Sequence, residues 1–324
     1  MTTNSQSTSV EASIKEQFPL WAQAPVVAPQ PFDGRYVVVG CGSSYYIAQS
    51  VAATFNQHGQ PAVAVAGNEW ASHSGAYVTP QEKVRVVAVS RSGESTETIL
   101  ALREAQKAGL HVTGITCEEG STLAREADTV LYAETHLREG VVMTASASLM
   151  LLEGLRLAGA TIDGAAVARQ AEELLNTHAP QLAEAVRGRT HFVVLGAAEL
   201  HGMAQEGALK MQEMSLSFSQ AYHPMEYRHG PMSLVDDQTL IVLLYHPRTA
   251  DAEARVARDM GALGARMIGI GGPGDLSIPL DSTDAATRAL LALPLLQWLG
   301  QLVAEQKGID SEKPRHLTKV VSLA

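Results

Sequence analysis

The sequence contains two copies of one pattern, and this repetition constrains the fold more than any other feature. A β-branched run that ends in glycine occurs at residues 37–40 and again at 192–196. Glu69 is matched by Glu226, and the Gly-rich run at 109–115 by the run at 264–270. All three matches have an offset of about 156 residues, and repetition at a fixed spacing is the signature of a duplicated unit. The chain is therefore expected to fold as two related domains.

Each copy alternates short apolar runs with stretches of helical periodicity. Alternation of this kind is typical of a parallel sheet covered by helices on both faces. In the first copy we expect strands near 35–40, 61–66, 84–89, 111–116 and 129–133, and helices near 43–57, 95–108 and 144–158. The predicted fold class is α/β, with two tandem three-layer αβα domains.

Domain boundaries follow from changes in composition. An Ala-, Glu- and Gln-rich stretch over 167–186 has the composition of a helical connector, and prolines 25, 29 and 31 follow one short amphipathic segment near the start. We expect a tail over 1–30, a first domain over 31–165, a connector over 166–188 and a second domain over 189–324.

Composition excludes several classes of protein. The net charge of −10 disfavours a nucleic-acid partner, because the phosphate backbone would be repelled. The two cysteines, Cys41 and Cys117, have no CxxC spacing, so neither a disulfide framework nor a zinc site is indicated. The start has no secretory signal pattern, and the most apolar segment, 289–303, is too short and too interrupted to span a bilayer. A cytoplasmic protein without membrane contact is expected.

A hydroxyl-rich turn in the first copy is the candidate ligand site. The apolar run 84–89 ends in Ser90-Arg-Ser-Gly-Glu-Ser95, which opens a helix. A helix N-terminus offers free backbone N–H groups and a positive dipole end, which suit a phosphate monoester. The alternative is a helix start that is merely rich in capping residues. In the second copy the equivalent turns, 196–199 and 245–248, lose these hydroxyls, and Pro247 removes a donor. One phosphate site per chain is therefore expected.

Possible catalytic side chains lie mostly in the second copy. Lys210 and Glu213 are expected on one face of a helix, although such a pair is more often a surface ion pair. His229 precedes Gly-Pro and therefore lies in a turn, where a histidine is usually only solvated. By themselves these residues are not specific.

Five segments in order give the chain a family resemblance. They are Ser43-Ser44, Ser90–Ser95, Ala208–Glu213, Glu226–Pro231 and Lys313–Lys319. Together they resemble the tandem sugar isomerase (SIS) domain proteins over about residues 31–324, in particular the isomerase half of glucosamine-6-phosphate synthase. The resemblance is closer to the stand-alone type II glucosamine-6-phosphate deaminases, on the basis of Ser90-Arg91, Val142–Thr144 and Glu226–His229.

The resemblance implies a role for individual residues. It places catalysis on Glu213 (proton shuttle), His229 (ring opening, in the site of the neighbouring subunit), Lys319 and Lys210. It places contacts with the phosphate and the sugar on Ser43, Ser44, Ser90, Arg91, Ser92, Ser95, Val142 and Thr144. A homodimer with shared active sites is implied, and the chemistry needs no metal or other cofactor.

The residues and the resemblance leave the substrate open. The implied reaction converts glucosamine 6-phosphate to fructose 6-phosphate and ammonia through aldose–ketose proton transfer. The alternatives are a fructosamine-6-phosphate deglycase, a synthase-like isomerase without a glutaminase, and a non-catalytic sugar-phosphate sensor. Arg91 stands where the synthase has glutamine and Ser146 where it has lysine, and about 30 residues before the first domain are too few for a glutaminase.

Overall fold

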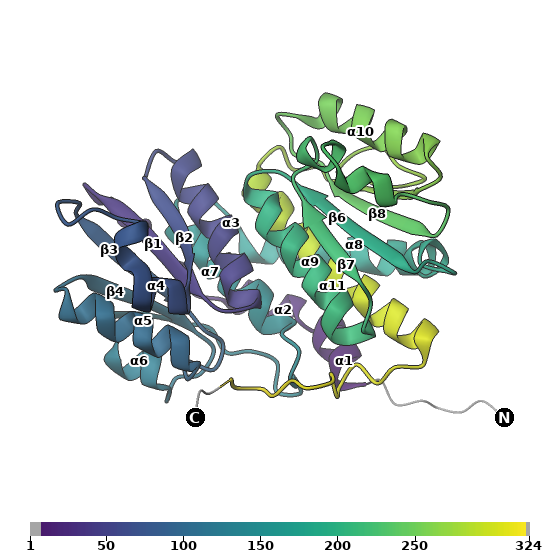
Figure 1. Ribbon diagram of the computed structural model, residues 1–324. Coiled ribbons are helices and arrows are strands. Elements are labelled where there is room, and N and C mark those ends of the chain that lie inside the picture. The colour runs from purple at the N-terminus through teal and green to yellow at the C-terminus, as the bar shows by residue number, and fades with distance from the viewer. Residues whose placement is uncertain (1–7, 322–324) are drawn as a thin grey trace.

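The computed structural model describes residues 8–321. Within this range the strands form two parallel five-stranded sheets, with the orders β2-β1-β3-β4-β5 and β10-β9-β8-β6-β7. Read from its other edge, the second sheet has the order β7-β6-β8-β9-β10. Its strands β6 to β10 therefore occupy the same places as β1 to β5 in the first sheet. The prediction of two tandem αβα domains is confirmed, and Figure 1 shows them side by side.

The elements of the first domain match the predicted ranges closely. The strands are β1 (Arg35–Gly40), β2 (Ala62–Ala66), β3 (Val84–Val89), β4 (His111–Thr116) and β5 (Thr129–Tyr132). The helices are α3 (Ser43–Gln57), α4 (Gly67–His73), α5 (Thr96–Lys107), α6 (Thr122–Glu126) and α7 (Ala145–Leu157), with a 3₁₀ turn η1 (Ser74–Ala76). The short helices α4 and α6 were not predicted.

The second domain repeats this plan with longer helices. The connector is α8 (Gly164–Ala185), followed by β6 (His191–Gly196), α9 (Glu199–Ser215) and β7 (Ser219–Tyr222). The remaining elements are η2 (Glu226–Arg228), η3 (Pro231–Leu234), β8 (Thr239–Leu244), α10 (Ala250–Ala262), β9 (Arg266–Ile270), β10 (Leu276–Ile278) and α11 (Ala285–Lys307). No helix within residues 8–321 is long and apolar enough to cross a membrane.

The side chains of each strand alternate between the two faces of its sheet, so the apolar core is divided into separate clusters. In β1, Val38 faces a large cluster shared with α3 and α7, whereas Val37 and Val39 face a separate cluster under α5. In β6, Phe192 and Val194 belong to that same large cluster together with α9 and α11. Because successive strand residues point to opposite faces, each sheet turns one face toward the other domain. The two domains therefore share one continuous core.

The N-terminal segment differs from the expected tail. Residues 8–24 contain α1 (Ser9–Lys15) and α2 (Phe18–Gln23), whose apolar side chains, among them Ile14 and Trp21, are buried in the large cluster. The indole nitrogen of Trp21 donates to Ser148 on α7 at 2.9 Å. The interpretation of residues 1–30 as a tail was thus wrong for this stretch, because burial against α7, α8 and α11 stabilises helices too short to persist alone.

Candidate active site

Two helix N-termini meet at the carboxyl edge of the first sheet. β1 pairs with both β2 and β3, so the chain crosses over between β1 and β3, where ligands bind in open α/β sheets. Ser43 and Ser44 open α3 immediately after β1, and Ser95 is the N-cap of α5 after β3. The first turn of each helix has amide groups without partners in its own helix. The edge therefore offers hydroxyls and amides to an anion.

The turn after β3 is held in shape by its own hydrogen bonds. The amide of Gly93 donates to the hydroxyl of Ser90 at 3.1 Å, and the amide of Glu94 donates to Ser92 at 3.2 Å. Gly93 has φ +60°, and a Cβ there would lie 2.1 Å from the Ser121 hydroxyl oxygen, so only glycine fits. The turn is therefore preformed around Ser90 and Ser92.

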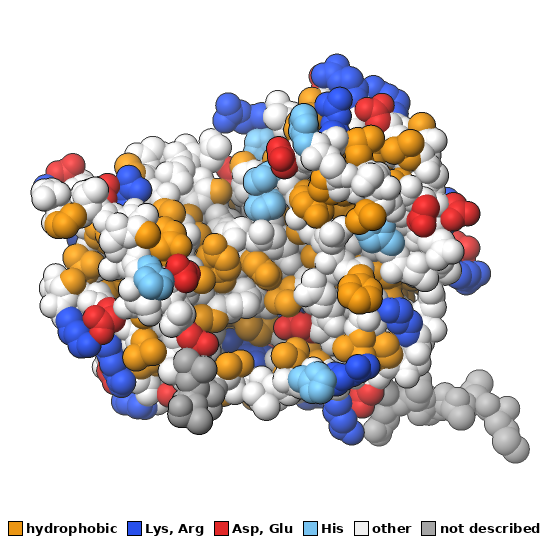
Figure 2. Space-filling view, in the orientation of Figure 1, with side chains coloured by type: hydrophobic (Ala, Val, Ile, Leu, Met, Phe, Trp, Pro, Cys, Tyr) orange, Lys and Arg blue, Asp and Glu red, His pale blue; other side chains and the backbone are white. Residues whose placement is uncertain are grey.

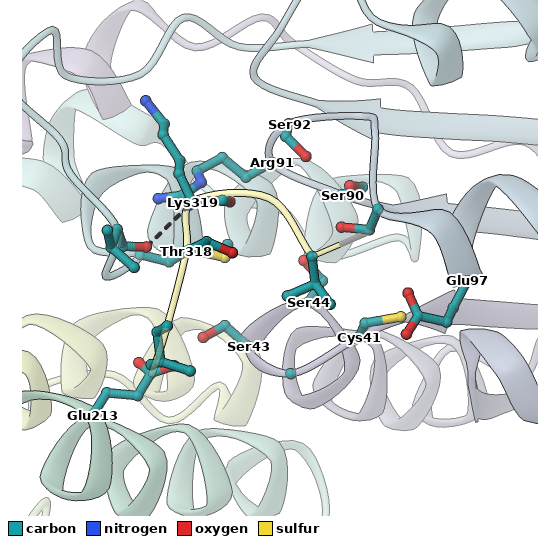
Figure 3. Close-up of a pocket in the computed structure, with 16 residues that line it drawn as sticks. Cys41, Ser43, Ser44, Ser90, Arg91, Ser92, Glu97, Glu213, Thr318 and Lys319 are labelled. Atoms are coloured by element: carbon teal, nitrogen blue, oxygen red, sulfur yellow. Dashed lines mark hydrogen bonds between the residues drawn. The ribbon is translucent and has the colours of Figure 1, made fainter. Parts of the chain in front are cut away.

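All five serines line one pocket of about 260 Å³. Figure 3 shows Ser43, Ser44, Ser90 and Ser92 around it, with Glu213 entering from the other domain. The other lining residues are Cys41, Gly42, Arg91, Ser95, Glu97, Val141, Met143, Leu317, Thr318, Lys319 and Val321. Sequence reasoning placed the serines, Arg91, Glu213 and Lys319 in a single site, and the structure brings them together.

Glu213 is part of a charged cluster on α9. Lys210 lies beneath it, completely buried, with its Nζ 2.5 Å from Glu213 Oε2, 3.3 Å from Glu206 Oε1 and 3.3 Å from the Ser43 hydroxyl. Burial opposes the charge on Lys210, but the two carboxylates together hold its pKa above the ordinary value. The Lys210–Glu213 pair is therefore no surface ion pair: only the Glu213 carboxylate, 19% exposed, reaches the pocket.

Glu206 was not predicted from the sequence. Its carboxyl group is fully buried, and burial, with Glu213 adding to it, raises its pKa despite the nearby ammonium. When Glu206 is protonated, Lys210 and Glu213 form a single neutral ion pair, and when it is ionised the three side chains carry one net negative charge. The signal in the sequence was its position four residues before Lys210, on the same face of the helix.

The C-terminal segment folds back over the pocket. The Lys319 carbonyl accepts from Arg91 at 3.1 Å, and the Val321 carbonyl accepts from the amide of Thr96 at 3.4 Å. The side chain of Lys319 points away from Glu213 (Figure 3). Its Nζ donates to the carbonyl of Glu139 at 3.4 Å. In this arrangement the segment covers the serines, while the Lys319 ammonium group is directed to the Glu139 carbonyl.

Arg91 and the turn at 139–144 differ from their expected positions. The guanidinium of Arg91 donates to the carbonyls of Gly140 and Val141, each at 3.0 Å, in addition to Lys319. Val142 and Thr144 are buried and do not line the pocket; their neighbours Val141 and Met143 do. Along this turn the side chains of Val141 and Met143 face the pocket, while those of Val142 and Thr144 face the interior.

His229 lies outside this pocket. It follows η2 in the second domain and is exposed. The pocket formed by one chain thus contains the serines and Glu213 without the histidine. Within residues 8–321, no group of three or more His, Cys, Asp or Glu side chains is arranged to hold a metal ion.

Comparison with known families identifies the fold. The SIS domain model matches two segments, residues 33–158 and 186–285, which together cover more than half of the chain. The chain belongs to the SIS domain family. The two matched segments coincide with the two sheets of this tandem SIS protein.

Individual relatives agree with this assignment. The glucosamine-6-phosphate deaminase from Thermotoga maritima, known from a crystal structure, is 31% identical in sequence to this chain. The two structures match with a TM-score of 0.85 over 98% of this chain and 100% of that chain. Tagatose-6-phosphate ketose/aldose isomerase from Escherichia coli shares the fold, with a TM-score of 0.83 at 23% identity over 95% of both chains. The glutamine–fructose-6-phosphate aminotransferase (isomerizing) of Pyrobaculum aerophilum is 28% identical over 93% of this chain and 54% of its own length. The SIS chain spans about half the length of the curated relatives it matches.

Proposed function

We propose that this SIS protein converts glucosamine 6-phosphate and water to fructose 6-phosphate and ammonia. The observation that carries the proposal is the placement of one partly exposed carboxylate, Glu213, across the pocket from the serine-lined helix N-termini. Such a pocket suits a substrate with a phosphate at one end and an acidic C–H bond at the other. The full-length similarity to the Thermotoga deaminase supports this substrate over other sugar phosphates.

The phosphate would bind at the serines. Ser44 and Ser90 are buried and border the amides of two helix N-termini, where an anion is stabilised by hydrogen bonds and by the dipoles. This site needs no cationic side chain, which accords with the engagement of the Arg91 guanidinium by protein carbonyls. The sugar would extend from the serines toward Glu213.

Glu213 would move the proton. In the open-chain sugar it takes the proton from C2. The C–H electrons form the C1–C2 double bond and the C1 carbonyl oxygen takes up a proton from solvent, which gives the enolamine. Return of the C2 proton to C1, with loss of one proton from nitrogen to solvent, leaves an imine at C2 and a hydroxyl at C1. Water adds to the imine and ammonia leaves, giving fructose 6-phosphate. One carboxylate serves both transfers, and the buried Lys210 fixes its position.

Ring opening requires a second group. Histidine titrates near neutral pH and can pass a proton to the ring oxygen. Because His229 is exposed and lies outside the pocket of its own chain, we propose that it enters the pocket of a second subunit. The proposed active unit is a homodimer with two shared sites.

The test is turnover with a matched pair of variants. The wild-type protein is incubated with glucosamine 6-phosphate, and fructose 6-phosphate and ammonia are measured together; they should form in equal amounts. Glu213→Gln should lower kcat by about 10²–10⁴-fold, whereas Glu104→Gln, a surface carboxylate paired with Lys107, should not. Fructoselysine 6-phosphate is assayed in parallel. Lysine release in place of ammonia release would replace the deaminase by a deglycase, and no turnover of either substrate would reject both.

A further inference from the structure

Glu139 is a buried carboxylate beside the pocket that the proposed reaction does not use. It is 5% exposed, and one of its oxygens accepts four hydrogen bonds. The donors are the amide and hydroxyl of Thr144, at 2.5 and 3.0 Å, and the amide and hydroxyl of Ser146, at 3.1 and 3.0 Å. Its second oxygen accepts from Thr135 at 2.9 Å. The side chain therefore closes the turn 139–146 on itself.

This carboxylate replaces the usual cap of α7. Thr144 occupies the N-cap position, but its side chain makes no capping hydrogen bond. Glu139 instead accepts from the amide of Ser146, one of the first-turn amides that lack a partner within the helix. A negative charge at a helix N-terminus is also favoured by the dipole. The start of α7 is thus set by a residue five positions upstream of its N-cap.

The main chain of the same turn faces the pocket side. The carbonyl of Glu139 accepts from Lys319 Nζ, and the next two carbonyls accept from Arg91. Val141 and Met143 line the pocket. Consequently, any shift of the turn moves both the pocket wall and the acceptors that hold Arg91 and the C-terminal segment.

We propose that Glu139 is a positioning residue, which holds the turn 139–146 so that the pocket wall, Arg91 and Lys319 keep their places around the substrate. The proposal rests on the proposed function for its kinetic readout. It assigns Glu139 a geometric role, because its carboxylate is turned to Thr144 and Ser146 and is absent from the pocket lining.

Two substitutions separate geometry from charge. In Glu139→Gln the amide oxygen still accepts all four bonds, and the NH₂ group donates to the Thr135 hydroxyl. Glu139→Asp keeps the charge but withdraws it by one methylene. We expect kcat for glucosamine 6-phosphate to fall about 10²-fold in the Asp variant, the scale of a small misplacement, and only a few-fold in the Gln variant. Affinity for inorganic phosphate should stay unchanged in both variants, since the serines are untouched.

The control is Glu134→Asp, an exposed carboxylate five residues earlier. An Asp variant of Glu139 as active as wild type, or more active than the Gln variant, would overturn the proposal. So would a loss of phosphate affinity equal to the loss of kcat, which is the pattern of general destabilisation.

Amide hydrogen exchange gives a readout independent of activity. Peptides covering 140–150 and 313–321 should exchange faster in Glu139→Asp than in Glu139→Gln and wild type. Equal exchange in all three would overturn the positioning role whatever the enzyme does. Faster exchange in the Asp variant, combined with a wild-type protein that does not act on glucosamine 6-phosphate, would support the positioning role and reject the proposed function alone.

Discussion

The Nζ atom of Lys210 lies 2.5 Å from a carboxylate oxygen of Glu213, and the lysine side chain is completely buried. The two residues are one turn apart on α9, so the helix itself sets their distance. Glu206 supplies a second carboxyl group at 3.3 Å. The position of the proposed proton carrier thus depends on a cation that solvent does not reach.

Lys210→Met should destabilise the protein as well as inactivate it. The substitution preserves volume but leaves two carboxyl groups without their cation, and breaking a buried pair costs about 3–5 kcal/mol. Urea denaturation measures the loss in the free energy of unfolding. Lys107→Met, at an exposed ion pair on α5, provides the comparison and should change stability by less than about 1 kcal/mol. Equal midpoints for the two variants would contradict a structural role for Lys210.

Glu153 should make stability depend on pH. It is fully buried on α7, its oxygens have no hydrogen-bond partner among the described residues, and burial raises its pKa to about 7 from 4.5. Between these values the unfolded chain releases the proton first, so stability falls as pH rises from about 4.5 to 7 and then levels off, by about 3 kcal/mol in total. Glu153→Gln should remove this component, leaving a flatter profile in urea titrations at pH 5 and pH 8. A slope equal to that of wild type would show that Glu153 is not the source.

Ser90 and Ser92 should anchor the phosphate. Replacing both with alanine removes hydroxyls from the pocket, and each hydrogen bond to a charged group contributes about 1.5–3 kcal/mol. Calorimetry should show weaker binding of the sugar phosphate by a few kcal/mol, with little further loss for the unphosphorylated sugar. Ser233→Ala, on the exposed η3 turn, is the matched control. Equal losses for the phosphorylated and free sugars would place the phosphate elsewhere.

Removal of residues 315–324 should stop turnover and spare the fold. In its described part, residues 315–321, the segment contributes Leu317, Thr318, Lys319 and Val321 to the pocket but no residue to the buried core. We expect kcat to fall at least about a hundredfold, as when a charge-stabilising group is lost, with the unfolding midpoint nearly unchanged. Lys319→Ala should reproduce most of the loss, because we expect its ammonium group to leave the Glu139 carbonyl and turn toward the bound substrate. Lys313→Ala should cause none of it. Native turnover by the truncated protein would exclude both a covering role and a catalytic Lys319.

Complementation between subunits should reveal a shared site. A Glu213→Ala protein and a His229→Ala protein are each expected to be inactive. In a mixed dimer one site would combine the intact His229 of one subunit with the intact Glu213 of the other. Part of the activity should therefore return when the two are refolded together, and verified heterodimers without activity would place both residues in a single-chain site.

The predictable parts of the structure are those governed by local pattern. In the first domain the strands lie within one residue of their predicted ends, because buried parallel strands are β-branched runs bounded by turn residues. The serines around Ser90 could be assigned because the strand–turn–helix signal is continuous in sequence.

The unpredicted parts depend on distant contacts. α1 and α2 pack against segments more than a hundred residues away in the sequence, and one such contact joins Ser13 to Thr144 at 2.7 Å. Glu139 carries no signal in a single sequence, because its partners are main-chain amides and hydroxyls on a helix that the pattern indicates only as apolar. The direction of the Lys319 side chain likewise depends on a carbonyl far away in the chain.

Gly202 bears on how a substrate enters. A Cβ at this position of α9 would lie 2.2 Å from the Tyr46 carbonyl oxygen on α3, so the two helices touch backbone to backbone across the shared core. A hinge motion between the domains would have to break that contact, whereas the C-terminal segment is held over the pocket by a few hydrogen bonds. We therefore expect the two domains to behave as one rigid frame with a single movable cover. The rates at which substrate enters and product leaves should then be set by the opening of the segment 315–321.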